Sequence, residues 1–148
     1  MSNLKRFVKL SDLAEIRTGF TFREKVEEVE SGNAHVLQIK DIRSIATDTC
    51  GYTLFADALP QIGWHGKDNA IVSPETVLLP CRGEYLKAHY FVGYQDQSKA
   101  LPLIVSSQFL ILMPNQNVLP EYLCWYLNQP NVQYELRKES QGSKMPML

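Results

Sequence analysis

Basic side chains stand where the chain is predicted to turn, and such side chains bind phosphate. Arg82 follows the apolar segment 77–81 and precedes Gly83, so a tight turn would direct its guanidinium away from the core. A guanidinium forms paired hydrogen bonds to phosphate or to the edge of guanine. Lys40 and Arg43 follow a predicted strand. The position of Arg82 favours a phosphate or base contact, whereas a solvated sheet edge is an equal alternative for Lys40 and Arg43.

Aromatic side chains accompany several of these cations. Phe20 and Phe22 precede Arg23 in an alternating pattern that suits a strand edge or a loop that stacks on a partner, although packing of both rings into the core is favoured. Trp64 lies close to Lys67 at a predicted loop tip. Aromatic faces stack on bases and cations meet the backbone of nucleic acids. We nevertheless expect Trp64 to be tucked under its own loop.

Residue patterns for catalysis and metal binding are missing from the sequence. It contains no Gly-x-Ser-x-Gly, no Walker loop, no Gly-x-Gly-x-x-Gly and no His-Glu-x-x-His. A nucleophile–base pair of Cys81 with His65 or His89 is disfavoured, because a cysteine in an apolar strand is usually a small core residue. The cysteines and histidines lack paired ligand spacing, so a zinc site is disfavoured too.

Length and composition are those of one soluble globular domain, residues 1–148. The chain is 45% hydrophobic and 21% charged, and this length suffices for a core of its own. No apolar run approaches the roughly 20 residues of a membrane helix, and no signal-peptide core follows the N-terminus. Three cysteines, an odd number, argue against a disulfide framework. We therefore expect a cytoplasmic protein.

The distribution of charge weakens the objection that a net charge of −1 raises against nucleic-acid binding. Lysine and arginine outnumber aspartate and glutamate between residues 5 and 25, and Glu27, Glu28 and Glu30 follow directly. Segregation of this kind allows a basic face on a nearly neutral chain.

Helices and strands are predicted in a mixed order. The capping pattern at Ser11 predicts a short helix, and residues 34–39 alternate as a strand. Residues 103–113 are apolar and rich in β-branched side chains, which predicts a strand covered on both faces. Pro120 opens a helix, and after an interruption a second helix runs over residues 132–139.

Several segments, taken in order, resemble a target recognition domain of the specificity subunit of type I restriction-modification enzymes. One is Thr18-Gly19-Phe20-Thr21-Phe22. The others are residues 9–16, 36–42, 77–83, 106–109, 122–127 and 142–143. The resemblance lies in their order and spacing across nearly the whole chain.

This resemblance implies an α+β (mixed α/β) fold, with a strongly twisted, largely antiparallel sheet and short flanking helices. It implies a non-catalytic domain that reads one half of a split target in double-stranded DNA and docks a methyltransferase subunit, while an ATP-dependent restriction subunit cuts. The methyl donor and ATP would belong to these partners, so no cofactor is expected here. The family usually continues past Gly-Ser into a long spacer helix, whereas this sequence ends at residue 148, as expected of either a fragment or a stand-alone domain.

We predict DNA contacts for basic, amide and hydroxyl side chains at loop edges. They are Arg23, Lys40, Arg43, Lys67, Arg82, Lys87, Gln141, Ser143 and Lys144. Near-neutral charge favours an alternative, a protein-interaction module or assembly factor of the same fold that does not bind DNA. A third reading is a small enzyme that uses Cys81 and a histidine.

Overall fold

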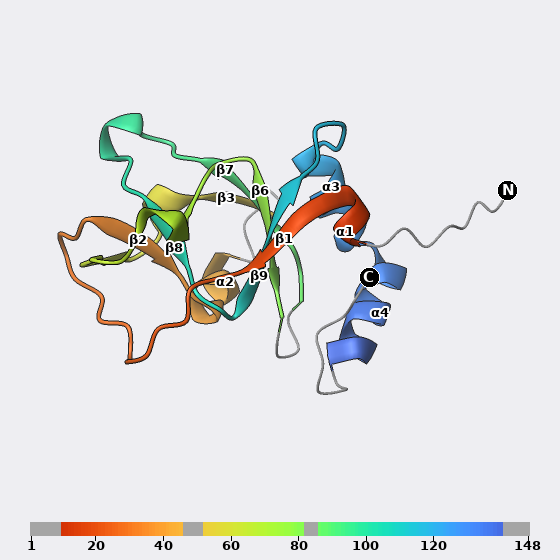
Figure 1. Ribbon diagram of the computed structural model, residues 1–148, viewed down its shortest axis with the longest axis horizontal. Coiled ribbons are helices and arrows are strands. Elements are labelled where there is room, and N and C mark those ends of the chain that lie inside the picture. The colour runs from red at the N-terminus through yellow and green to blue at the C-terminus, as the bar shows by residue number, and fades with distance from the viewer. Residues whose placement is uncertain (1–9, 46–51, 82–85, 141–148) are drawn as a thin grey trace, which may run out of the picture.

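The computed structural model describes residues 10–45, 52–81 and 86–140, which form two β-sheets and several short helices. One sheet has five strands in the order β1-β9-β6-β7-β3, and the other has four in the order β4-β2-β8-β5. The strands are β1 (Ala14–Thr18), β2 (Ala34–Leu37), β3 (Thr53–Phe55), β4 (Gln61–Ile62), β5 (Ile71–Val72), β6 (Thr76–Pro80), β7 (His89–Gly93), β8 (Leu103–Val105) and β9 (Phe109–Pro114). Figure 1 shows the four-stranded sheet at one end of the molecule and the helices α3 (Pro120–Leu127) and α4 (Pro130–Ser140) at the other.

The pairing of the strands confirms the predicted α+β class and its antiparallel character. Within the described residues, five strand pairings are antiparallel, and only β2–β8 and β3–β7 are parallel. The chain forms two sheets, however, where the sequence predicted one.

The apolar run 103–113 explains the second sheet. It was predicted as one strand, but it divides into β8 and β9, which belong to different sheets. The division lies at Ser106, whose Oγ donates to Gln108 Oε1 (3.0 Å) and accepts from Gln108 N (3.2 Å). These local bonds compete with the sheet pairing and bend the chain. The prediction of burial on both faces is confirmed, because β8 and most of β9 are buried.

Two apolar layers hold the sheets and helices together. Phe91, Phe109 and Leu103 belong to the layer between the two sheets and are fully buried. Leu123 and Leu136 pack α3 and α4 against the other face of the five-stranded sheet. The five-stranded sheet is therefore covered on both sides, which accounts for its apolar strands.

The predicted short helix near Ser11 is present, although it begins one residue earlier. Helix α1 spans Leu10–Leu13, and the chain enters β1 at Ala14. The Leu13 carbonyl accepts from Asn115 N (2.8 Å), and the Asp12 carbonyl accepts from Asn115 Nδ2 (2.8 Å). The carbonyls of Asp12 and Leu13 thus accept hydrogen bonds from Asn115, which follows β9, and are not available to extend the helix.

Lys40 and Arg43 lie in a helix, α2 (Ile39–Ile45), so the prediction that they follow directly on a strand edge was wrong. Asp41 Oδ2 accepts the N–H of Gln38 (2.8 Å), which is half of a capping box. The N–H of Ile39 donates to Gln108 Oε1 (3.0 Å). These two bonds satisfy the first amides of the helix and end β2 at Leu37.

The predicted interruption between the last two helices is confirmed. Asn128 closes α3, and its side chain accepts from Ala88 N (2.7 Å) and donates to Ala88 O (3.0 Å). Helix α4 begins at Pro130, two residues before its predicted start. Buried Gln133 donates to the carbonyls of Leu86 (3.0 Å) and Leu127 (2.7 Å). No helix in the described part of the chain has the length and apolarity that a membrane crossing requires.

Buried His89 on β7 makes the stability of the fold sensitive to mild acid. Burial disfavours the imidazolium and lowers the pKa of His89 from 6.5 to about 4. Between these values the unfolded chain binds a proton that the folded chain does not, so the free energy of unfolding falls as the pH falls from 6.5 towards 4. The expected slope is at most about 1.4 kcal/mol per pH unit.

Urea unfolding between about pH 7 and about pH 5 measures how the free energy of unfolding depends on pH. This range lies above the pH at which most carboxylates titrate. His89→Gln should flatten this pH dependence. His65→Gln removes an exposed histidine and should leave the slope unchanged. Equal slopes in wild type and His89→Gln would exclude His89 as the source.

Candidate nucleic-acid interface

The outer face of the four-stranded sheet is covered by aromatic side chains from two loops. Phe22 and Trp64 pack against a buried cluster that includes Val36 and Ile104. Phe22 belongs to the segment 19–33, which Figure 1 shows in orange, extending away from the sheets at the end remote from α3 and α4. This face therefore differs from the opposite face of the same sheet, which packs on the five-stranded sheet.

Phe20, Phe22 and Trp64 form an aromatic trio. The ring centroid of Phe20 lies 5.0 Å from that of Phe22 and 4.7 Å from that of Trp64, and each pair of rings meets edge-to-face. Phe22 and Trp64 are half-buried, whereas Phe20 remains 38% exposed. The prediction that both phenylalanines pack in the core is thus right for Phe22 only.

The backbone around Phe20 is fixed by the junction of β8 and β9. The N–H of Phe20 donates to Val105 O (2.7 Å), and its carbonyl accepts from Ser107 N (2.8 Å). Gly19 N donates to Phe109 O (3.0 Å). A Cβ on Gly19 would lie 2.0 Å from Ser106 O, so only glycine allows this approach of two backbones. The position of the Phe20 backbone is therefore set by the sheet.

The Trp64 loop, residues 63–70, is tied down by residues distant in sequence. Asn33 Nδ2 donates to Trp64 O (2.8 Å), and Trp64 N donates to Asn33 Oδ1 (2.5 Å). Arg17 donates to the carbonyls of Asn69 (2.5 Å) and Ile71 (3.0 Å). A Cβ on Gly66 would lie 2.2 Å from the Trp64 ring, which confirms that Trp64 is tucked against its own loop.

Basic side chains flank the aromatic trio. Arg23 follows Phe22 directly, and Lys67 lies in the Trp64 loop; both side chains are exposed. The segment that carries Arg23 also has an exposed lysine, Lys25, and exposed acidic side chains, Glu24, Glu27, Glu28 and Glu30. Arg23 and Lys67 are the two predicted contact residues that the structure brings to one end of the four-stranded sheet.

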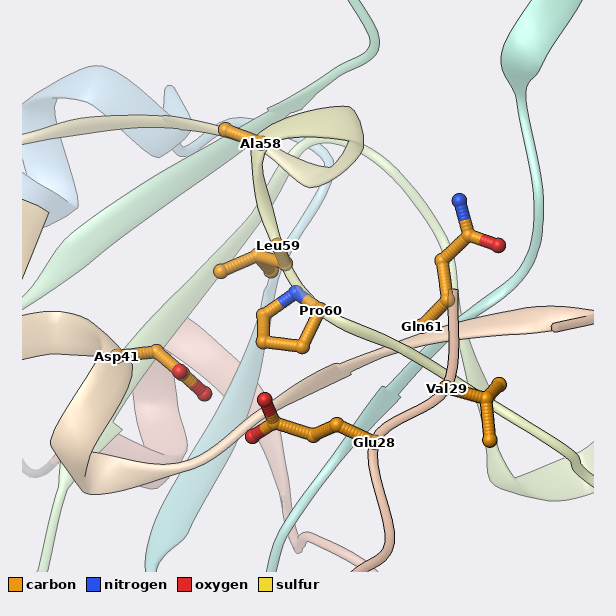
Figure 2. A pocket seen from close by; sticks show the side chains of 7 residues that line it. All are labelled: Glu28, Val29, Asp41, Ala58, Leu59, Pro60 and Gln61. Atoms are coloured by element: carbon orange, nitrogen blue, oxygen red, sulfur yellow. The ribbon is translucent and has the colours of Figure 1, made fainter. Parts of the chain in front are cut away.

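Lys40 lies in a different electrostatic setting. Its ammonium pairs with Glu28, beside a cavity of about 420 Å³ whose lining includes Glu28, Asp41 and Gln61. Figure 2 shows the Glu28 and Asp41 carboxylates pointing into the same space. Burial raises the pKa of Asp41, and the nearby charge of Glu28 raises it further. A phosphate would be repelled here, so Lys40 is a poor candidate for DNA contact.

The remaining predicted contacts are not brought to the aromatic trio by any described contact. Lys87 is half-buried and precedes β7. Arg43 lies in α2, and its side chain is outside the described part. Outside the described residues lie Arg82, Gln141, Ser143 and Lys144.

A second exposed aromatic surface lies on α3 at the opposite end of the molecule. Tyr122 and Trp125 are 54% and 58% exposed, and their ring centroids are 5.7 Å apart. Leu119, which precedes the helix, is 68% exposed. The buried residues of this helix, Leu123 and Leu127, face the sheet. We call Leu119, Tyr122 and Trp125 the α3 face.

Chemistry at cysteine or metal finds little support in the described residues. They contain no group of three or more histidine, cysteine or acidic side chains that could hold a metal ion. Cys81 is buried, with its Sγ 3.5 Å from Ser107 O. Burial raises the pKa of the Cys124 thiol to about 12, which keeps this sulfur protonated and unreactive at neutral pH.

Sequence reasoning missed two residues that build the site, Asn33 and Arg17. They are separated from their partners by 31 and 52 residues, and nothing in the local sequence signals either contact. The glycine at position 19 did give a signal, because it precedes the alternating Phe20 and Phe22.

Solved structures share this fold. One is the HsdS subunit from Thermoanaerobacter tengcongensis, with a TM-score of 0.58 and 18% sequence identity over 91% of this chain. Another comes from a study of assembly and conformational transition of the type I R-M system, with a TM-score of 0.59 and 16% identity over 97% of this chain. The chain spans about 30% of the length of each. No protein-family model matches it, and neither does any curated protein sequence. The fold of this chain is therefore shared with part of the HsdS subunit.

Proposed function

We propose that this chain recognises DNA sequence as part of a type I restriction-modification specificity subunit, reading one half of a split target. The observation that carries the proposal is the aromatic trio, with exposed basic side chains on the two loops that form it. Arg23 and Lys67 are exposed on these loops, whereas Lys40 is paired with Glu28 beside a cavity whose lining includes Asp41. The fold shared with HsdS supports the same function. Fold alone would not suffice, because one fold serves many functions.

The side chains of this surface would have two different roles in binding DNA. Cations position the phosphate backbone, and groups beside them read base edges in a groove. With a net charge of −1, the chain as a whole is not attracted to the phosphate backbone. Since phosphate contacts supply most non-specific affinity, binding by the chain alone should be weak and salt-sensitive, and tighter in an assembled enzyme.

Replacing Arg23 or Lys67 by alanine should weaken binding to a random-sequence duplex and flatten its salt dependence. Each lost phosphate contact reduces the slope of log K against log salt by about 0.9. Lys40→Ala is the matched control, because Glu28 already compensates this lysine. Fluorescence anisotropy at several salt concentrations measures the slopes. Equal slopes for all three variants would contradict the proposed interface.

Docking of a methyltransferase subunit is the second part of the proposal, and we assign it to the α3 face. Tyrosine and tryptophan are enriched in protein interfaces, and here they are exposed at the end remote from the aromatic trio. A partner could thus bind while DNA is held at the other end. Catalysis, the methyl donor and ATP would belong to the partner subunits.

The α3 face also favours the alternative function, a protein-interaction module that binds no DNA. DNA binding by the wild type distinguishes the two functions. Trp125→Ala should weaken subunit binding in either case, and it should leave any DNA affinity unchanged. Tyr134→Ala on α4 is a matched control with a similarly exposed ring. Subunit binding measured by calorimetry, together with an absence of any DNA binding in wild type, would support the alternative instead.

A further inference from the structure

Phe20 combines a fixed backbone with an exposed apolar ring. Hydrogen bonds to Val105 and from Ser107 hold both of its peptide groups, yet 38% of the residue is open to solvent. A side chain ordered before binding loses little conformational entropy when it contacts a partner. Phe20 is therefore already positioned for contact.

The ring is also supported from behind. Phe22 and Trp64 meet it edge-on, and both pack on the cluster that includes Val36 and Ile104. Bonds between Asn33 and Trp64 keep the Trp64 loop in place. Because protein interiors are closely packed, a bound partner that presses on the Phe20 ring would meet resistance from Phe22, Trp64 and the sheet behind them.

The surroundings of the ring suit a nucleic acid. Exposed Arg23 and Lys67 come from the two loops that carry the trio. An exposed apolar ring with cations on the same two loops matches a duplex, in which stacked bases lie between two phosphate strands. Apolar side chains of this kind enter base steps in several DNA-bending proteins.

We propose that Phe20 enters a base step of the bound duplex as an apolar wedge, partly unstacking two base pairs and bending the helix. This inference rests on the proposed function, because it needs DNA to lie across the aromatic trio. It adds a means of discrimination that involves no hydrogen bond to a base. Flexible pyrimidine–purine steps would be favoured at the wedge, since they are the easiest to unstack.

The test uses a duplex that the full chain enriches from a random-sequence pool. Adenines in that duplex are replaced one at a time by 2-aminopurine, whose fluorescence rises on unstacking, and end labels report bending by energy transfer. Wild type should brighten one step severalfold and bend the duplex. Phe20→Leu should keep both signals, because leucine also acts as a wedge. Phe20→Ala should lose both and bind about tenfold more weakly.

Tyr134→Ala removes a more exposed ring at the far end and should change nothing. Thermal melting confirms that each variant is folded. If Phe20→Ala does not fold, Phe20→Gln takes its place, because a polar side chain at this position should also lose both signals. Wild type that brightens no step, or Phe20→Ala that brightens the same step equally, would overturn the wedge while leaving DNA recognition intact. Failure to enrich any sequence would instead overturn the proposed function, and the wedge with it.

Discussion

Gly19→Ala is expected to lower the free energy of unfolding by about 3 kcal/mol, because the new methyl group collides with backbone atoms. A Cβ at this position would lie 2.0 Å from Ser106 O and 2.5 Å from Val105 O. Neither oxygen can move without disturbing the hydrogen bonds that hold Phe20 and Phe109. Urea unfolding gives the change in free energy directly.

Gly63→Ala is the matched control. A Cβ there has His65 Nε2 as its nearest neighbour, at 4.0 Å. Alanine in such an unstrained position restricts the unfolded chain, so a small stabilisation of about 0.5 kcal/mol is expected. Similar effects at Gly19 and Gly63 would show that the close approach of residue 19 to the junction of β8 and β9 is not present in solution. A variant at Gly19 that folds should also present Phe20 poorly and bind DNA more weakly.

Leu123→Ala is expected to destabilise the protein by about 3 kcal/mol, because a fully buried leucine leaves a cavity when it is truncated. Leu123 packs α3 against the five-stranded sheet. Its neighbour Tyr122 lies on the exposed α3 face, so Tyr122→Ala should change the free energy of unfolding by no more than about 0.5 kcal/mol. Thermal or urea unfolding of the pair measures how α3 is oriented. A large loss for Tyr122→Ala with a small one for Leu123→Ala would mean that the helix packs through its other side.

Which segments are buried could be predicted from the sequence more readily than where a strand ends or a helix begins. The apolar composition of residues 103–113 correctly predicted two covered faces. The division of this segment into two strands depends on hydrogen bonds between Ser106 and Gln108. In the sequence, these residues look like an ordinary polar interruption of an apolar strand. In the same way, alternation predicted the strand before Lys40, but the bond from Gln38 to Asp41 starts a helix there.

The candidate interface was only partly visible because it is assembled from distant segments. Arg23 and Lys67 could be selected as exposed cations in loops. Their common location depends on contacts between the segment 19–33 and the Trp64 loop, chiefly those of Asn33. Lys40 looked equivalent to them in sequence, and it differs only because folding places it beside Glu28. Phe20 and Phe22 have the same side chain, yet only Phe20 is left exposed by the sheet.

Selection from a pool of random-sequence duplexes tests the central claim, recognition of DNA sequence by the end of the molecule that carries the aromatic trio. The full chain is immobilised, bound duplexes are recovered through several rounds at low salt, and the recovered pool is sequenced. We expect wild type to enrich a short uninterrupted motif, as for one half of a split target. An Arg23→Ala, Lys67→Ala double variant should fail to enrich it, whereas Lys40→Ala should enrich the same motif. Recovery without any motif, or the same motif from the double variant, would contradict the account.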